Sequence, residues 1–156
     1  MQRNTRDHTE GLLSENDWNE FENISDCFVQ SSNKVCSSQI RNLCLNGEMV
    51  LREVLAEDIG MNGAMTALVD QLQALEVKPL PSALSNFSHL QLFFLSYAQS
   101  QCELTSVQTL ISLFDSDHPP AEEQVLLTLR NVEEFSEAFQ CPKGSFMRPK
   151  KRCPFL

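Results

Sequence analysis

The sequence predicts a mainly α-helical protein, and two observations support this fold class. Apolar residues recur three and four positions apart in several stretches, which is the period of a helix with one buried face. No stretch shows a convincing alternation of apolar and polar residues, the pattern typical of a half-buried strand. The 156 residues, 42% hydrophobic and 21% charged, suit one globular domain with a core of its own.

Two helices are expected in the first half of the chain. Ser14 and Asp17 have the spacing of a capping box, and apolar residues at helical spacing follow, which predicts a helix over residues 15–30. A second, longer helical pattern covers residues 48–76. Its centre holds Gly60 and Gly63, which together cost about 2 kcal/mol of helix propensity. They indicate a place where another segment packs closely against the backbone.

The second half continues with shorter helices and loops. Residues 78–85 hold two prolines and are expected to form a loop before a strongly apolar helix over 90–102, buried on most of its circumference. Thr105 is expected to begin another helix, which ends before Pro119 and Pro120. Residues 122–129 form a short helix or an extended piece, and Asn131 with Glu134 resembles a second capping box. Residues 141–156 are expected to be irregular.

Charge and composition argue against nucleic acid and anionic membranes as partners and favour an extracellular location. The net charge of −9 argues against nucleic acid or an anionic membrane as the main partner. No run approaches the roughly 18 apolar residues of a membrane span, and no secretory signal opens the chain. Six dispersed cysteines and two glycosylation sequons, at Asn23 and Asn86, nevertheless favour an extracellular protein. We therefore expect a chain that lacks its N-terminal part.

The residues alone contain no complete active site. Three histidines are present, but none is paired within a helix and none belongs to a His-Glu-x-x-His motif, the arrangement that places two metal ligands on one face. Glu57 is a carboxylate on a helix that ought to be buried, and His118 lies in a polar loop after a helix. Both are candidate functional side chains, and a solvated or salt-bridged acid is the alternative for Glu57.

Several segments, in order, resemble the neprilysin family of zinc metalloendopeptidases, which includes the endothelin-converting enzymes. The similarity covers essentially the whole chain and is carried by Leu45-Asn46-Gly47, the segment 56–65, Gln91-Leu92-Phe93-Phe94-Leu95 and the tail from Asn131 to Cys153. Arg3-Asn4 resembles sequence just downstream of the family's His-Glu-x-x-His helix. The resemblance implies the C-terminal helical part of a thermolysin-like catalytic domain, without that helix.

The resemblance gives roles to four positions. Glu57 falls on the family's third zinc ligand, and His118 on the histidine that stabilises the oxyanion of the transition state. Met61 stands where the family has an aspartate that orients a zinc-bound histidine, and Gln124 where it has an arginine that binds the substrate. Two functional positions are thus retained and two are lost. Zinc is the implied cofactor, although one carboxylate alone would hold it poorly.

The resemblance also bears on the cysteines. Cys27 and Cys153 match a family pair, which predicts a disulfide that staples the tail. Cys102 and Cys141 match cysteines whose partners lie in the family's N-terminal part, so here they are orphaned or pair with each other. Cys36 and Cys44 have no family counterpart and are either free or joined across the short loop between them.

These implications lead to three hypotheses about function, of which the third is a helical extracellular module with only a structural role. In the first, the chain is the C-terminal portion of a neprilysin-like peptidase that hydrolyses peptides when complete but is inactive alone. In the second, it is a divergent pseudopeptidase or truncated product that binds peptides or partners without catalysis. The family implies a cell-surface ectodomain anchored through an N-terminal segment that this chain lacks. We also expect exposed apolar surface on the helix at 90–102 or its neighbours.

Overall fold

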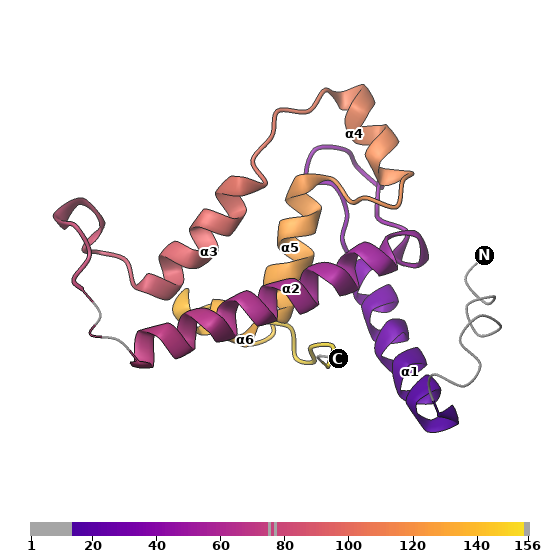
Figure 1. The fold of residues 1–156 in the computed structure, drawn as a ribbon. Coiled ribbons are helices and arrows are strands. Elements are labelled where there is room, and N and C mark those ends of the chain that lie inside the picture. The colour runs from indigo at the N-terminus through magenta and orange to yellow at the C-terminus, as the bar shows by residue number, and fades with distance from the viewer. Residues whose placement is uncertain (1–13, 75, 77, 155–156) are drawn as a thin grey trace.

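The computed structural model describes residues 14–74, 76 and 78–154, and within them it is helical without any extended strand. Six α-helices and one 3₁₀ turn follow one another in the chain (Figure 1). Their bounds are α1 Glu15–Ser32, α2 Gly47–Ala74, η2 Ser82–Leu84, α3 His89–Ser100, α4 Val107–Phe114, α5 Ala121–Asn131 and α6 Glu133–Ala138. The mainly α fold class is therefore confirmed.

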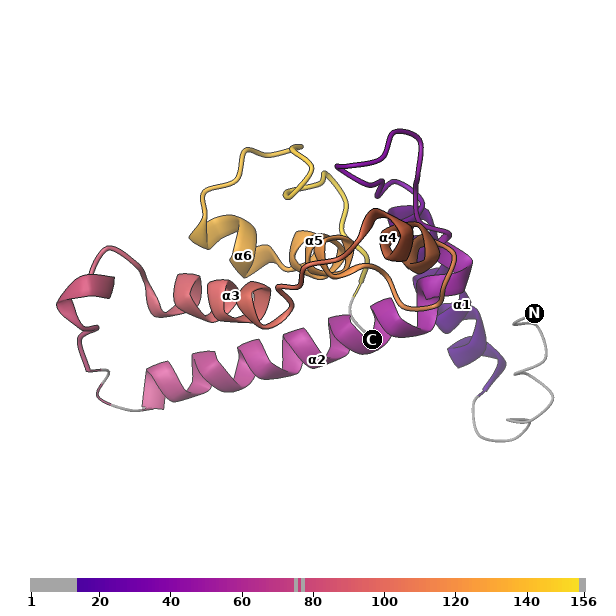
Figure 2. The same ribbon diagram turned by 90° about the horizontal axis from the view of Figure 1, so that it is seen from above.

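The long helix α2 lies at the centre of the fold, and other helices pack along it. Helix α1 crosses its N-terminal part, α5 packs against its middle, and α6 follows α5 and contacts α3. Seen from above, α3 runs alongside the C-terminal half of α2 (Figure 2). A functional side chain in the middle of α2 can therefore meet residues of both α3 and α5.

Two apolar clusters stabilise this arrangement, and α5 contributes to both. The first cluster joins α1, the N-terminal part of α2 and α4, and it includes Leu127 of α5. The second joins the following turns of α2 to α3, α6 and the tail, and it includes Leu129 of α5. Along α2, Leu55 belongs to the first cluster and Met61 to the second. Glu57 therefore lies where the two clusters meet.

The predicted capping boxes have two different outcomes. The box at Ser14 and Asp17 is confirmed, because the Asp17 carboxylate accepts the Ser14 backbone N–H at 2.9 Å and the Ser14 hydroxyl accepts the Asp17 N–H. The box at Asn131 was a wrong prediction, because Val132 is the cap of α6 and has no capping side chain. The Asn131 side chain instead donates to Asp58 at 2.8 Å and accepts the Cys153 backbone N–H at 2.8 Å.

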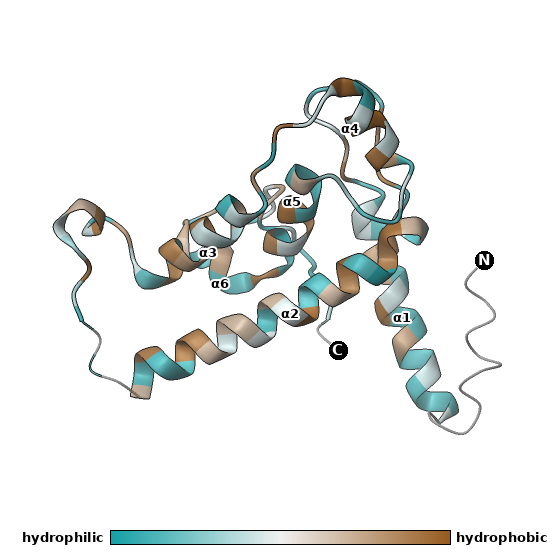
Figure 3. Ribbon diagram, turned by 45° about the horizontal axis from the view of Figure 1, so that its top comes forward, coloured by the Kyte–Doolittle hydropathy of each residue, from teal (hydrophilic) through white to brown (hydrophobic). Residues whose placement is uncertain are grey.

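The apolar helix α3 is less buried than its sequence indicates. Phe94 is 1% exposed, whereas the adjacent Leu95 is 41% exposed. The expectation of burial on most of the circumference is wrong, since α6 covers one side of α3 and no described element covers Leu95. The expected exposed apolar residues are present, at Leu95 of α3 and further along the chain at Leu104 and Val107. Figure 3 shows apolar segments on both α3 and α4.

The glycines of α2 also differ from expectation. A Cβ atom built on Gly60 or Gly63 would meet nothing within 4 Å, so no described segment packs against the backbone there. Close packing is instead found at Gly47, where a Cβ would lie 2.3 Å from the Val29 carbonyl oxygen. That contact explains the requirement for glycine where α1 and α2 cross.

One disulfide joins α1 to the tail, and a second closes a short loop. Cys27 of α1 is bonded to Cys153 of the tail, and Cys36 is bonded to Cys44 across their short loop. In the chain-entropy model, a closed loop as long as the one from Cys27 to Cys153 stabilises the fold by about 5 kcal/mol. The tail between residues 141 and 154 has no helix, as expected, and this bond holds it against α1.

Cys102 and Cys141 are free thiols. Gln91, in the first turn of α3, donates to the Ala138 carbonyl oxygen at 2.8 Å, so the end of α6 lies beside the start of α3. Cys141 follows that end, whereas Cys102 follows the far end of α3. The helix between them separates the two thiols by roughly 15 Å, which excludes a bond between them in this fold.

Candidate active site

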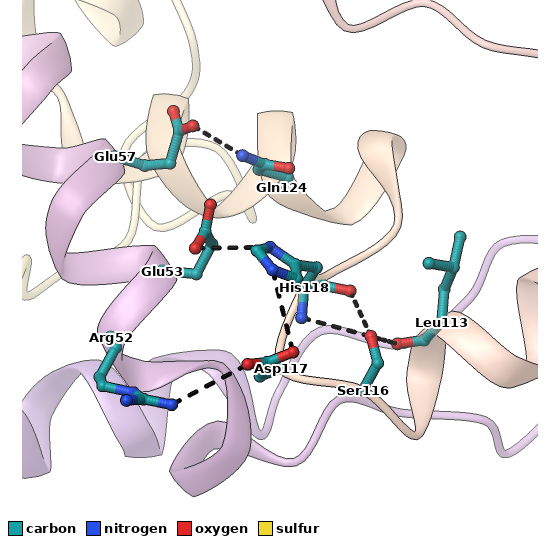
Figure 4. A network of polar contacts seen from close by, with 8 residues as sticks. All are labelled: Arg52, Glu53, Glu57, Leu113, Ser116, Asp117, His118 and Gln124. Carbon is teal, nitrogen blue, oxygen red and sulfur yellow. Dashed lines mark hydrogen bonds and ion pairs between the residues drawn. The ribbon is translucent and has the colours of Figure 1, made fainter.

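Glu57 projects from the middle of α2 and has a hydrogen-bond donor at each carboxylate oxygen. The Gln124 side-chain amide of α5 donates to Oε1 at 2.7 Å (Figure 4). The Tyr97 hydroxyl of α3 donates to Oε2 at 3.0 Å. The structure thus brings Glu57 and Gln124, two of the positions singled out in the sequence, into direct contact.

Tyr97 extends this contact into a small network. Its hydroxyl also lies 3.2 Å from Thr128 Oγ1, and the Thr128 hydroxyl donates to the Gln124 carbonyl oxygen at 2.9 Å. Burial raises the pKa of Tyr97 to about 12; the hydrogen bond to Thr128 opposes this shift and the charge of Glu57 adds to it. Tyr97 therefore keeps its proton near neutral pH and acts as a donor to Glu57.

His118 lies in the loop between α4 and α5. It contacts Glu53, which precedes Glu57 by one turn of α2. Its Nδ1 is 3.4 Å from Oε2 of Glu53, and its Nε2 is 3.9 Å from Oδ1 of Asp117 (Figure 4). The Ser116 hydroxyl accepts the His118 backbone N–H at 3.2 Å and holds the loop in shape. The side chain is 69% exposed, so these contacts contribute little to stability and the imidazole is open to a ligand.

Met61 lies one turn beyond Glu57 on the same helix. It is 5% exposed and belongs to the apolar cluster that includes Phe94 and Leu129. A thioether in this setting is packed as a core residue and has almost no capacity to accept a hydrogen bond from an imidazole. The position that resemblance assigns to a histidine-orienting aspartate is therefore part of the core in this chain.

A groove opens beside Glu57, between α2 and α3. Its volume is about 500 Å³, and its walls are mainly apolar, with Gly60 and Met61 on one side and Phe93 and Tyr97 on the other. The exposed glycine backbone of α2 thus faces an open groove. Such a groove is large enough for a few side chains of a peptide or of another helix.

The described residues do not make up a zinc site by themselves. They include no group of three histidine, cysteine, aspartate or glutamate side chains placed to hold a metal ion. Glu57 is a single carboxylate whose two oxygens already accept hydrogen bonds. A catalytic zinc requires about three protein ligands and an open position for water, so this part of the chain does not fit the metal on its own.

Comparison with known proteins identifies the chain. The model of peptidase family M13 matches residues 1–155. The chain belongs to peptidase family M13. Its M13 relatives include a protein of Locusta migratoria named endothelin-converting enzyme homolog, 36% identical over 115 residues, and the neprilysin of Oryctolagus cuniculus, 34% identical over 137 residues. Neprilysin-21 of Caenorhabditis elegans is 32% identical over 148 residues.

This M13 chain spans less than a fifth of the length of these relatives. The three alignments cover 73%, 86% and 88% of the chain but 16%, 18% and 19% of the relatives. M13 peptidases are metallopeptidases, which implies a metal cofactor for the family. Among the residues that the structure describes, no helix is long and apolar enough to cross a membrane. Arg3 and Asn4 lie outside the described residues.

Tyr97 and Thr128, two residues of the network around Glu57, were not singled out from the sequence. Tyr97 falls within the apolar helix expected over residues 90–102, but the structure gives its hydroxyl two polar neighbours. The signal was present, because a tyrosine buried in an apolar helix needs a partner for its hydroxyl. Which residue supplies that partner depends on the packing of α3 against α2 and α5, and no local pattern encodes it.

Proposed function

We propose that this chain is a portion of a neprilysin-like zinc metalloendopeptidase and that it does not hydrolyse peptides by itself. Glu57 and His118 stand at the positions of a zinc ligand and an oxyanion-stabilising histidine. The observation that carries the proposal is the state of Glu57: both of its oxygens accept hydrogen bonds, and the described part of the chain holds no group of three side chains placed to bind a metal ion. In this proposal, hydrolysis requires residues that supply a His-Glu-x-x-His motif.

The neighbouring surface suits a role in peptide binding within a larger peptidase. His118 is exposed beside the turn of α2 that precedes Glu57, and the apolar groove lies on the other side of Glu57. An extended peptide could cross this face, with side chains in the groove and carbonyl groups near His118. The substrate class we propose for the complete protein is therefore peptides, as the names of its relatives suggest.

A divergent pseudopeptidase is the second candidate, and Met61 favours it. Its burial at 5% exposure leaves the family's histidine-orienting position without a hydrogen-bond acceptor. Losing a residue that hydrogen-bonds to a metal ligand commonly lowers metal affinity or activity by about 10–100-fold. Gln124 adds to this effect, because a neutral amide cannot form the charged pair that an arginine forms with a carboxylate.

An ectodomain location follows from the same proposal. Both disulfides suit an oxidising compartment, and Asn23 and Asn86 are exposed where a glycan could be attached. We propose that the complete protein is a cell-surface or secreted glycoprotein. Expression in secreting cells, followed by glycosidase treatment, would reveal a mass loss that disappears in Asn86→Gln if that sequon carries a glycan.

A cleavage assay on the purified chain tests the central proposal. We expect no hydrolysis of a fluorogenic peptide with or without added zinc, and less than one zinc per chain by elemental analysis. The matched control is Glu57→Gln, which removes the charge but keeps the size of the side chain. Stoichiometric zinc together with chelator-sensitive cleavage that Glu57→Gln abolishes would contradict the proposal.

A further inference from the structure

We propose that Gln124 and Tyr97 take the place of a metal at Glu57 and form a metal-independent clasp between α2, α3 and α5. The clasp is defined as the two hydrogen bonds that these side chains donate to the Glu57 carboxylate. The inference rests on the proposed function, in which Glu57 stands at a zinc-ligand position. It goes further, because it assigns Glu57 a different role in this chain.

The geometry of the clasp leaves little freedom to the carboxylate. Each oxygen of Glu57 has its own donor, Gln124 at 2.7 Å and Tyr97 at 3.0 Å, and the donors come from different helices. Thr128 lies one turn beyond Gln124 on α5 and contacts both Tyr97 and the Gln124 carbonyl oxygen. The two donors are thus held relative to each other as well as to Glu57.

The charges around Glu57 are also consistent with the clasp. None of the salt bridges found among the described residues involves Glu57, so neutral donors, and not a cation, compensate its burial. Hydrogen bonds to an ionised group are stronger than those between neutral groups. A zinc ion at about 2.0–2.2 Å from either oxygen would have to share that oxygen with Gln124 or Tyr97.

The clasp has a mechanical consequence for the groove. Glu57 and Tyr97 lie on opposite walls of the groove and are joined across it. Gln124 ties the same carboxylate to α5, which packs against the middle of α2. Loss of either donor therefore loosens one helix from α2 and leaves a half-buried carboxylate with an unpaired oxygen.

Substitutions at Gln124 in the 156-residue chain test the clasp in the presence of a chelator. Gln124→Ala removes the donor, Gln124→Glu keeps the size but places a second carboxylate against Glu57, and Gln124→Arg restores a donor. We expect the melting temperature to fall by about 3–6 °C for Gln124→Ala, further for Gln124→Glu, and to recover in Gln124→Arg. Gln73→Ala, an exposed glutamine on α2, is the matched control.

A double-mutant cycle isolates the hydrogen bond itself. Glu57→Ala and Gln124→Ala combined should lower the melting temperature by less than the sum of their separate effects, because each removes the same bond. Tyr97→Phe should behave in the same way with Glu57→Ala. In nitrogen-15 spectra, the Gln124 side-chain amide signals should shift in Glu57→Gln more than those of Gln73.

Zinc distinguishes the clasp from a latent metal site. The clasp predicts that added zinc leaves the melting temperature of the wild-type chain unchanged. A rise with zinc in the wild type that is absent in Glu57→Gln would overturn the inference, as would Gln124→Ala and Gln124→Glu variants that unfold at the wild-type temperature. These measurements are independent of peptide cleavage, so failure of the clasp and failure of the proposed function are separate results.

Discussion

At the scale of single residues, Tyr97 offers a direct probe of the site because it is the only tyrosine in the chain. Absorbance of the phenolate should rise near pH 12 in the folded protein and near pH 10 in urea. Since the folded pKa is the higher one, the stabilisation is present below pH 10 and is lost as the pH rises toward 12. Glu57→Gln should lower the folded pKa, because the carboxylate charge contributes to the shift.

The control for this titration is Glu48→Gln, which removes an acid from the first turn of the same helix, far along α2 from Tyr97. It should leave the Tyr97 titration in place. A folded protein whose single tyrosine titrates near pH 10 would show that the Tyr97 hydroxyl is not buried against Glu57.

Met61 tests whether the family's aspartate position has become a core position. Met61→Asp in the isolated chain should lower the free energy of unfolding by about 3–5 kcal/mol, because it buries a carboxylate that has no partner. Met61→Leu, which conserves volume, should cost less than about 1.5 kcal/mol. Urea unfolding followed by circular dichroism measures both. Equal stability of the two variants would contradict the burial of Met61.

Residue identities at the candidate site were predictable from the sequence, but their contacts were not. Resemblance singled out Glu57 and Gln124 separately, as a retained and a lost position, and nothing in the sequence indicated that they bond to each other. They lie 67 positions apart, and their contact at 2.7 Å depends on how α5 packs against α2. Tyr97 and Thr128 were missed for the same reason.

At the scale of elements, Asn131 links three parts of the fold. Its side chain donates to Asp58 of α2 and accepts the backbone N–H of Cys153 in the tail. Burial raises the pKa of Asp58 and the hydrogen bond from Asn131 lowers it, so the carboxylate depends on this partner. Asn131→Ala should lower the free energy of unfolding by about 2–3 kcal/mol, because both groups lose their partner.

Asn19→Ala, at an exposed position of α1, is the control for Asn131 and should change stability by less than about 0.5 kcal/mol. Both variants can be measured by thermal unfolding under oxidising conditions, so that the disulfide at Cys153 stays intact. If Asn131→Ala were as stable as the control, the Asn131 hydrogen bonds between α2, α5 and the tail would contribute nothing to the free energy of unfolding.

The helices themselves were well predicted, because their signals are local. Ser14 with Asp17 and Ser88 with Gln91 cap α1 and α3, where the sequence placed helix starts. The prediction failed at Asn131, where a residue with the right spacing for a cap is used for a long-range contact instead. It also failed at Leu95, because a run of apolar residues indicates what a helix can bury but not how much of it is covered in this chain.

At the scale of the whole molecule, the exposed apolar residues and the open groove are consistent with a family whose members are much longer proteins. The chain spans less than a fifth of its relatives. Leu95 and Leu104 are exposed, and no described segment packs against Gly60. The sequence predicted the fold class and the family, whereas the identity of the groove's walls required the arrangement of α2 and α3 in space.

We propose that the chain is a portion of an M13 peptidase and, as the second candidate function, that Met61 and Gln124 weaken catalysis even within a full-length peptidase. The most direct test is a chimera in which the chain replaces the matching segment of rabbit neprilysin, assayed for peptide cleavage. We predict cleavage at least about 10–100-fold below that of the parent, with a gain when Met61→Asp and Gln124→Arg are introduced together. A chimera as active as the parent without these two changes would contradict the account.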